Sequence, residues 1–377
     1  MPWNNLTNPT SQRADFLELL AQRNGSFTEA CRRFRISRKT GYKWLGRATA
    51  DQPHPLVDRS RRPHHCPRRT PSDIEAAILR IHDAYGWGAR KIHAYLAGRP
   101  GLPGSRTIQE VLRRHDRVAA RGPAAQVQRF ERSTPNHLWQ IDYKGPLDGL
   151  PQRRYLLTVL DDHSRYLLAL RLCPDQAMAT AWTALWTLFG EAGLPEAILS
   201  DNGFGPRGAS VGGLSWLEAR LLRLRIESIH GRAYHPQTQG KVERLHGTLE
   251  QEVLPRLDLQ RPAAEVAEAL REWRCEVYNK IRPHEALGND PPASRWYQSE
   301  RPRPVRLPPI SYPAGMQTRK VMQRGEISWR GYELMVGSGL TGQYVGVSER
   351  DNTVVLCYGP RVLRRISFDQ LRRGRIV

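Results

Sequence analysis

The chain of 377 residues is poor in cysteine, and its cysteines are not arranged in pairs. The five cysteines are scattered, at Cys31, Cys66, Cys173, Cys275 and Cys357. Their odd number and the lack of a C-x-x-C motif argue against a zinc module and a disulfide scaffold and favour a reducing compartment. His64 and His65 precede Cys66, but three adjacent residues cannot easily surround one ion, so we expect no metal there.

The sequence also lacks a long apolar run. Its N-terminal stretch, "MPWNNLTNPTSQRADF", has no apolar centre of the kind that a secretory signal peptide needs. No run reaches the roughly 18 apolar residues that a membrane-spanning helix requires. These absences predict a cytoplasmic protein with no membrane contact.

Acidic residues are scarce relative to basic ones. The sequence has 58 lysines and arginines against 37 aspartates and glutamates, a net charge of +21. Such an excess points to a polyanionic partner, most simply nucleic acid, because each neutralised phosphate releases condensed counterions. The alternative is a charge that serves solubility alone.

The length of the chain and the changes in residue composition along it predict several domains. The expected parts are a helix-turn-helix domain (1–48), a basic proline-rich linker (49–70), a second helix-turn-helix domain (71–116), a linker (117–132), a catalytic core (133–297), a linker (298–316) and a small β-barrel (317–377). The expected fold class is therefore multidomain, with N-terminal all-α units, a central α/β mixed sheet and a C-terminal barrel.

The stretch "SRKTGYKWLGRA" has the features of a DNA-recognition helix. Ser37 stands where an N-cap belongs, and basic residues then recur every four positions along one face. Tyr42 and Leu45 are expected to face inward. The predicted DNA contacts on this helix are Arg38, Lys39, Lys43 and Arg47. A solvated helical hairpin with a basic face is the alternative interpretation.

The residue pattern changes at "HLWQIDYKG", where apolar and polar residues alternate. Trp139, Ile141 and Tyr143 fall on one face of the predicted strand, and Asp142 falls on the other. Two further strand-like runs follow, and then helices and strands alternate, which predicts a mixed sheet. Asp201 ends a later strand in "AILSDNG", at the edge where open α/β sheets bind their ligands.

Three acids carry the chemical hypothesis: Asp142, Asp201, and Glu243 in the first turn of a predicted helix. Converging carboxylates bind hard divalent cations, and two such ions about 3.5 to 4 Å apart suit the cleavage of a phosphodiester. Taken alone, Asp201 is equally consistent with a loop cap, and Glu243 with a surface ion pair to Arg244. The predicted DNA contacts around Glu243 are Arg232, His235, Gln239, Lys241 and Arg244.

These motifs resemble the DDE transposases of bacterial insertion sequences, whose catalytic core is similar to retroviral integrase. The resemblance depends on "LWQIDYKG", "LTVLDDHSR", "LSDNG", "HPQTQGKVERLHGTL" and "YNKIRPHEAL", within about residues 133–297. It implies a ribonuclease H-like core that uses two Mg²⁺ or Mn²⁺ ions per active site. In this sequence the catalytic and metal-binding acids would be Asp142, Asp201 and Glu243.

The resemblance also implies roles for smaller features. Asn202 and Gly203 would shape the loop after the second acid, and Asp161 and Asp162 match a position that is structural rather than catalytic. The glycine-rich segment 203–214 is longer than the integrase-like pattern needs. It is either a flap that faces DNA or tolerated surface.

The leading hypothesis is a transposase that binds the terminal inverted repeats of its element, cleaves a phosphodiester and joins the freed 3′-hydroxyl to target DNA. The expected partners are double-stranded DNA and at least one further copy of the chain. Some relatives also use a helper ATPase, and the sequence leaves open whether this protein does. The expected location is the bacterial nucleoid. The alternatives are a catalytically silent DNA-binding regulator derived from a transposase, and a ribonuclease acting on RNA–DNA hybrids.

Overall fold

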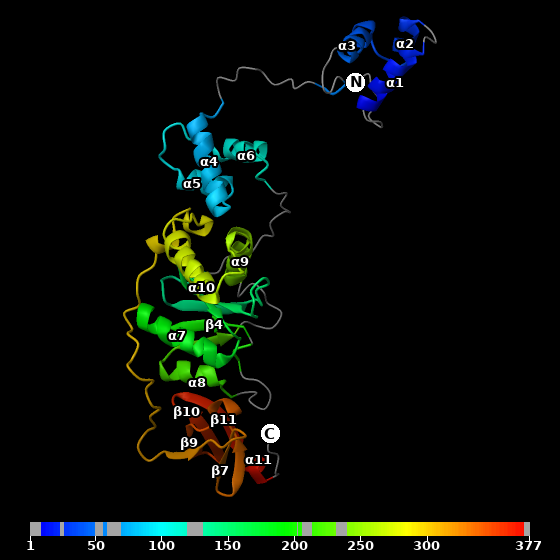
Figure 1. Cartoon of the computed structure of the whole chain (residues 1–377). Helices are drawn as coiled ribbons and strands as arrows, with labels where there is room; N and C mark the ends of the chain where they lie inside the picture. Colours follow the sequence, from blue (N-terminus) through cyan, green and yellow to red (C-terminus); the bar gives the residue numbers. More distant parts are fainter. Residues whose placement is uncertain are drawn as a thin grey trace. The chain divides into compact units, whose positions relative to one another are not determined.

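The protein is described here from a computed structural model. The structure describes residues 9–22, 26–49, 56–58, 69–118, 131–201, 203–205, 213–230 and 240–372. It divides into two compact units, residues 1–69 and 70–377 (Figure 1). Four predicted site residues, Asn202, Arg232, His235 and Gln239, lie outside the described residues, as does most of the segment 203–214.

The first unit is a bundle of three helices. They are α1 (Pro9–Ala21), α2 (Phe27–Arg33) and α3 (Arg38–Ala48). Ser37 is the N-cap of α3, as predicted, because its side chain accepts a hydrogen bond from the backbone of Thr40 at 3.1 Å. Phe16, Cys31 and Ile36 are buried between the helices. Ile36, from the turn between α2 and α3, therefore holds the last two helices together.

The inward face of α3 differs from the one that the sequence predicted. Trp44 is the buried aromatic, whereas Tyr42 is 60% exposed and stacks on Phe27 with ring centroids 4.1 Å apart. The guanidinium groups of Arg13 and Arg47 lie 3.8 and 4.7 Å from the centroid of the Trp44 ring. Helical spacing alone could not decide which of two aromatic residues, two positions apart, the bundle would bury.

The second unit begins with three more helices, as predicted. They are α4 (Ser72–Tyr85), α5 (Ala89–Tyr95) and α6 (Ser105–Arg114). They share an apolar core around Trp87, which includes Ile78, Ile92 and Ile108. The apolar residues that recur at helical spacing in these three helices are thus core positions.

A five-stranded mixed sheet forms the centre of this unit. Its strands are β1 (Leu138–Lys144), β2 (Tyr155–Asp161), β3 (Leu167–Cys173), β4 (Ala197–Ser200) and β5 (Glu227–His230). Their order is β3-β2-β1-β4-β5; β1, β2 and β3 pair antiparallel, while β4 is parallel to both β1 and β5. The predicted mixed sheet is confirmed.

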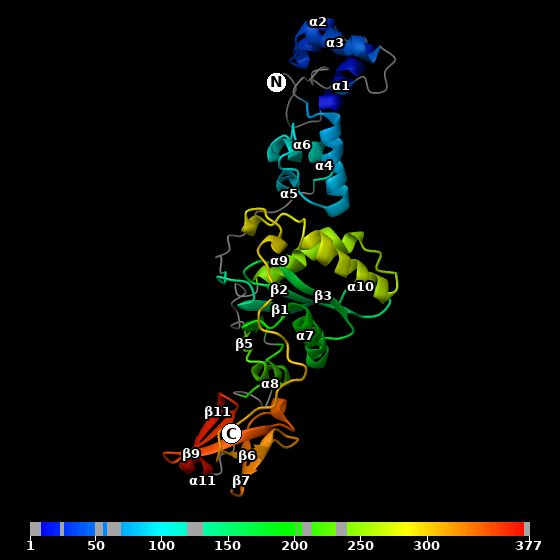
Figure 2. The same cartoon turned by 90° about the vertical axis from the view of Figure 1, so that its left-hand side faces the viewer.

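Helices cover both faces of the sheet (Figures 1 and 2). They are α7 (Met178–Ala192), α8 (Trp216–Arg223), α9 (Gly240–Thr248), η3 (Leu249–Val253), η4 (Leu254–Arg256), α10 (Ala263–Glu272), η5 (Trp273–Tyr278), η6 (Glu285–Leu287) and η7 (Pro292–Ser294). Trp139 and Ile141 pack with α7 and α8 on one face, and Leu156 and Leu160 pack with α9 and α10 on the other. Among the described residues, no helix is long and apolar enough to cross a membrane.

The segment predicted as a linker, 298–316, is bound to this domain by arginines. Arg301 donates to the carbonyl oxygens of Pro195 and Leu224, at 2.6 and 2.9 Å. Arg303 donates to the carbonyl oxygen of Trp186 at 3.0 Å. Its proline content predicted an extended chain, but proline content cannot show that guanidinium groups will anchor such a chain to helix carbonyls.

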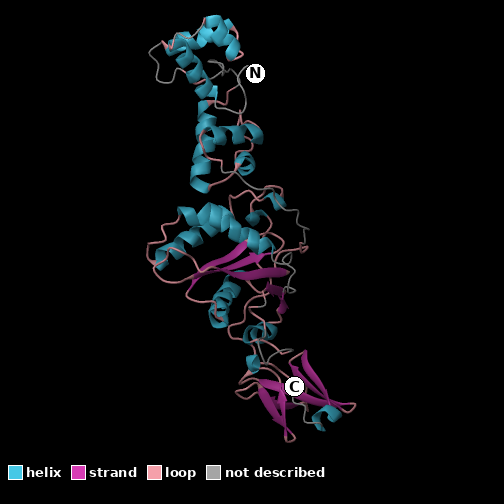
Figure 3. Ribbon diagram, turned by 90° about the vertical axis from the view of Figure 1, so that its right-hand side faces the viewer, coloured by secondary structure: helices cyan, strands magenta, loops and turns pink. Residues whose placement is uncertain are grey.

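The C-terminal tail is a β structure, but the predicted barrel does not close (Figure 3). Its elements are β6 (Gln317–Lys320), β7 (Glu326–Trp329), β8 (Tyr332–Met335), η8 (Ser338–Leu340), β9 (Tyr344–Arg350), β10 (Thr353–Tyr358), β11 (Arg361–Ser367) and α11 (Phe368–Arg372). A four-stranded antiparallel sheet in the order β11-β10-β9-β6 lies beside a separate β7-β8 hairpin. Over residues 317–372 no ladder joins the two sheets, because the short β6 pairs only with β9.

Candidate active site

The three predicted acids come from one edge of the central sheet and the helix over it. Asp142 lies near the end of β1, in register with Thr158 of β2. Asp201 is the first residue after β4, which is parallel to β1, so both acids follow the same strand direction. Glu243 is in the first turn of α9, which packs against β1 and β2.

The charges of Asp201 and Glu243 act on the carboxylate of Asp142. Burial raises the pKa of Asp142 from 3.8 to about 6, and the negative charges of Asp201 and Glu243 contribute to this rise. A hydrogen bond of 2.8 Å from the backbone of Tyr143 opposes it. Asp142 therefore lies within electrostatic reach of both other acids, although the three residues are far apart in the sequence.

The groups beside Asp142 leave its charge uncompensated. Its Oδ2 lies 3.9 Å from Nδ1 of His246, and Nε2 of His246 lies 3.0 Å from the hydroxyl of Thr158. Burial lowers the pKa of His246 to about 4, so the imidazole is neutral at pH 7. Lys144 binds Glu250 instead. Helical spacing from Glu243 puts His246 on a neighbouring face of α9, but no pattern in the sequence indicates that its imidazole lies beside Asp142.

The chain turns tightly after Asp201. The backbone N–H of Gly203 donates to Oδ1 of Asp201 at 2.9 Å. A β-carbon at position 203 would lie 2.8 Å from the same oxygen, which explains why glycine fits there. Phe204 then enters the core and stacks on Tyr143 with ring centroids 5.7 Å apart. The beginning of the glycine-rich segment is therefore anchored to β1.

The chemistry of the three acids suits a hard divalent cation. Carboxylate oxygens are the ligands that Mg²⁺ and Mn²⁺ prefer, and mutual repulsion of this kind is relieved by a cation. Within the described parts of the chain, however, no group of three or more His, Cys, Asp or Glu side chains is close enough to hold a metal ion. The metal-binding role of Asp142, Asp201 and Glu243 stays a prediction.

Asp161 and Asp162, at the β2–β3 turn, are structural. Asp161 accepts hydrogen bonds from Asn136 N–H at 2.7 Å and from Ser164, and it is fully buried. Asp162, also fully buried, accepts from Gln140 Nε2 at 2.7 Å and binds the ammonium group of Lys241. Lys241, predicted as a DNA contact, is thus engaged with a buried acid.

The other predicted DNA contacts differ in accessibility. Arg38, Lys39, Lys43 and Arg244 are exposed. Arg47 is half-buried because it covers Trp44, so its side chain supports the bundle. Three of the four predicted contacts on α3 therefore lie on one solvent-facing surface; their contact with DNA stays a prediction.

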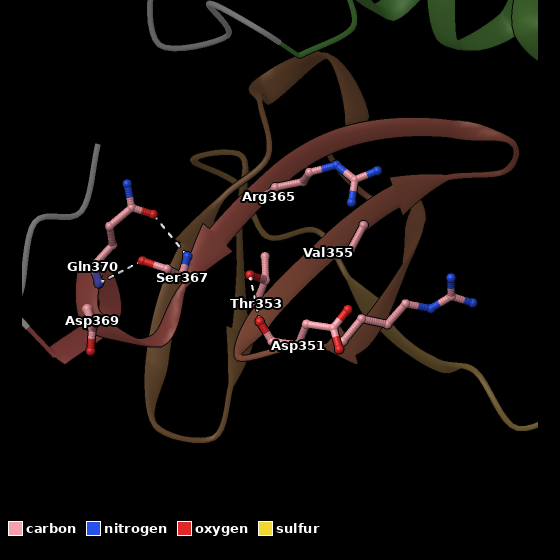
Figure 4. Close-up of a pocket in the computed structure, with 8 residues that line it drawn as sticks. Asp351, Thr353, Val355, Arg365, Ser367, Asp369 and Gln370 are labelled. Atoms are coloured by element: carbon pink, nitrogen blue, oxygen red, sulfur yellow. Dashed lines mark hydrogen bonds between the residues drawn. The ribbon is translucent and has the colours of Figure 1, made fainter.

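A pocket lies in the C-terminal tail, on strands β9, β10 and β11 and helix α11 (Figure 4). Its lining residues are Arg350, Asp351, Thr353, Val355, Arg365, Ser367, Asp369 and Gln370. Ser367 and Gln370 bind each other, through Ser367 N–H to Gln370 Oε1 at 2.9 Å and Gln370 N–H to Ser367 Oγ at 3.3 Å. The lining includes two arginines and two aspartates, and none of the predicted catalytic acids takes part.

Comparisons with known families agree with this arrangement. Residues 132–236 and 224–292 each match a family described as Integrase core domain. Residues 12–64 match a family described as Helix-turn-helix domain. The first match covers β1 to β5, and the second covers α9 and α10.

Relatives of the chain include viral and insertion-element proteins. A Gag-Pol polyprotein of Baboon endogenous virus (strain M7) is 33% identical over 156 residues, which cover 41% of this chain and 8% of the polyprotein. An uncharacterized 39.2 kDa protein of insertion element IS476 from Xanthomonas euvesicatoria is 27% identical over 246 residues, covering 61% of this chain and 66% of that protein. The chain thus spans a small part of the polyprotein and just under two thirds of the insertion-element protein.

Two solved structures are similar over parts of the chain. The catalytic core domain of BIV integrase is 20% identical, with a TM-score of 0.32, over 42% of this chain and 92% of that one. A chain of the simian T-cell lymphotropic virus intasome, solved with PP2A regulatory subunit B56 gamma, is 15% identical, with a TM-score of 0.37, over 78% of this chain and 96% of that one.

The matched families and the insertion-element relative confirm the resemblance on which the sequence hypothesis depends. The chain contains segments that match the integrase core and helix-turn-helix families, and it is similar to a protein of a bacterial insertion element.

Proposed function

We propose that the protein is a transposase that binds the terminal inverted repeats of its element and catalyses strand cleavage and strand transfer through Asp142, Asp201 and Glu243. The N-terminal helix-turn-helix would bind the repeat, with Lys39 and Lys43 on its exposed face. Two copies of the chain, or more, would hold the two ends of the element together.

The residues of the core have separate tasks in this proposal. Asp142, Asp201 and Glu243 would hold two Mg²⁺ or Mn²⁺ ions, which supply an activated nucleophile and stabilise the leaving oxygen of the phosphodiester. Asp142, fixed in the β1–β2 ladder, sets the base of the site. The exposed Glu243 of α9 and Arg244 beside it would face the DNA backbone.

One observation carries the proposal: Asp142, near the end of β1, lies within electrostatic reach of Asp201, which follows the parallel strand β4, and of Glu243 on α9. The pKa of Asp142, about 6, agrees with this placement, because burial raises it and the charges of Asp201 and Glu243 add to the rise. Such an arrangement costs stability, and acids held in this way are typical of functional sites. The buried structural acids differ from Asp142 in their partners: Asp162 binds the ammonium group of Lys241, and Asp161 accepts hydrogen bonds from Asn136 and Ser164.

The alternative, a catalytically silent DNA-binding regulator, predicts tight binding without chemistry. Cleavage and joining assays on a duplex with the inverted repeats that flank the gene distinguish the two. Asp201→Asn should remove cleavage while leaving end binding unchanged. Repeat-specific binding by wild type with no cleavage under Mg²⁺ or Mn²⁺ would favour the regulator.

A matched control comes from the other end of the same strand pair. Glu227 is an exposed acid at the start of β5, in register with Ala197, whereas Asp201 follows the C-terminal end of β4. Glu227→Gln removes the same charge from the same sheet, so it should cleave at the wild-type rate. Cleavage by Asp201→Asn at that rate would contradict the assignment.

A further inference from the structure

A polar cluster lies where α8 meets the C-terminal ends of β4 and β5. We call it the edge cluster; it consists of Ser200, Ser215, Glu218 and His230. Glu218 is 8% exposed, and both serines are buried as well. A buried carboxylate costs free energy unless it is paired and hydrogen-bonded, so each contact of Glu218 is informative.

Glu218 uses its two carboxylate oxygens for different purposes. Oε2 accepts from the backbone N–H of Ser215, and Ser215 Oγ accepts from the N–H of Glu218 at 3.2 Å, which together form a capping box for α8. Oε1 lies 2.9 Å from Nε2 of His230. The capping box explains the first contact only, since a glutamine would cap the helix as well.

His230 connects Glu218 to the end of β4. Its Nδ1 lies 3.2 Å from the hydroxyl of Ser200 and 3.4 Å from the carbonyl oxygen of Asp201. Its Nε2 lies 2.9 Å from Oε1 of Glu218, so both ring nitrogens have partners. The imidazole therefore bridges a buried carboxylate and the backbone of a proposed catalytic residue.

The backbone at Asp201 is less constrained by sheet hydrogen bonds than the backbone at Asp142. Asp142 is inside the β1–β2 ladder, opposite Thr158. The β4–β5 ladder ends at the pair Ser200 and His230, one residue before Asp201. The side chain of His230 thus contacts Asp201 at the point where the sheet hydrogen bonds stop.

We propose that Glu218 and His230 are positioning residues, which fix the backbone at Asp201 and thereby the direction of its carboxylate. The inference rests on the proposed function and deepens it, because it states what holds the second acid in place. Neither residue touches the reacting atoms, so the pair acts through Asp201. Hydrogen-bonding partners of this kind typically change metal affinity or activity about 10- to 100-fold when they are replaced.

The test uses the full-length chain and Glu218→Gln, which keeps the helix cap and removes the charge that His230 binds. Two quantities are measured: the affinity for Mn²⁺ alone, by calorimetry without DNA, and the single-turnover cleavage rate at saturating DNA. We expect both to fall about 10- to 100-fold while DNA affinity stays unchanged. Should this variant not fold, His230→Gln gives the same test, because the side chain of His230 is 24% exposed and tolerates replacement better.

Glu252 supplies a matched control. It is also 8% exposed, and its carboxylate binds Arg282 at 2.9 Å, but it belongs to η3 on the other face of the sheet. Glu252→Gln should lower thermal stability and leave Mn²⁺ affinity and cleavage per folded molecule unchanged. Wild-type Mn²⁺ affinity in Glu218→Gln, or an equal loss in Glu252→Gln, would overturn the inference.

The same assays separate this inference from the proposed function. If Asp201→Asn abolishes cleavage and Glu218→Gln does not slow it, the positioning role is wrong and the catalytic assignment stands. If Asp201→Asn cleaves normally, the catalytic assignment itself is wrong.

Discussion

Replacing Asp142 with asparagine should make the folded protein more stable when divalent ions are absent. An asparagine can still accept the hydrogen bond from the backbone of Tyr143, but it carries no charge to be desolvated or repelled. The repulsion from Asp201 and Glu243 disappears with that charge. A charged acid of this kind lowers the stability of the folded protein, as is expected of a site that is prepared to bind a cation.

The magnitude follows from the pKa of Asp142. At about 1.36 kcal/mol per pKa unit, a rise from 3.8 to about 6 corresponds to about 3 kcal/mol as an upper value. For a domain of this size that stabilisation would raise the melting temperature by about 6 to 12 °C.

The pH dependence of stability gives the sign of the difference between variant and wild type. Because the folded state holds the proton of Asp142 more tightly than the unfolded state, stability falls as the pH rises from about 4 to about 6 and then levels. The gap between variant and wild type should therefore be largest at pH 7 to 8 and close toward pH 4.

Thermal unfolding in EDTA, followed by tryptophan fluorescence from pH 4.5 to 8, measures this gap. Asp175→Asn is the control, because hydrogen bonds from Thr180 and the backbone of Ala177 lower the pKa of Asp175. That variant should not gain stability at any pH. An Asp142→Asn protein that melts below wild type at pH 8, or a gap independent of pH, would refute the reasoning.

Four other substitutions have defined outcomes. Lys43→Ala should weaken binding to DNA of any sequence and lower the slope of log affinity against log salt concentration by about 1. Arg47→Ala should mainly destabilise the first unit. Binding titrations between 50 and 200 mM salt and melting curves distinguish the two variants. Gly193→Ala should cost about 1 to 3 kcal/mol in urea unfolding, because Gly193 has φ +79° and a β-carbon there would lie 2.7 Å from the carbonyl oxygen of Ser299. Leu249→Ala, at a fully buried position under the sheet, should cost about 2 to 5 kcal/mol in the same assay.

Much of the fold was predictable because it depends on local periodicity. Alternation in "HLWQIDYKG" assigned the two faces of β1 correctly, and Trp139 and Ile141 do enter the core. Val242, Leu245 and Leu249 are spaced by three and four residues, and this helical spacing matches the row of buried side chains that begins on α9 and continues into η3. These patterns repeat within one element, so they need no knowledge of its neighbours.

The errors concern contacts between elements. The exposure of Tyr42 depends on how α3 sits against α2, and the arginine anchors of segment 298–316 depend on carbonyl oxygens far away in sequence. The predicted barrel does not close, because the lengths of short strands do not determine which sheet edges will pair.

The site shows the same division. The acids could be identified from motifs, and the structure brings Asp201 and Glu243 within electrostatic reach of Asp142. Glu218 could be predicted only as a helix cap, from the serine three residues before it. Its contact with His230 joins α8 to β5, and no local pattern in the sequence indicates it.

The most direct test of the central claim is strand cleavage on a duplex that carries the inverted repeats flanking the gene. Wild type and Glu243→Gln are compared with Mg²⁺ and with EDTA. Our account predicts metal-dependent nicking at the tip of the repeat by wild type and none by the variant, with equal binding of the repeat by both. Equal nicking by Glu243→Gln, or nicking in EDTA, would contradict it.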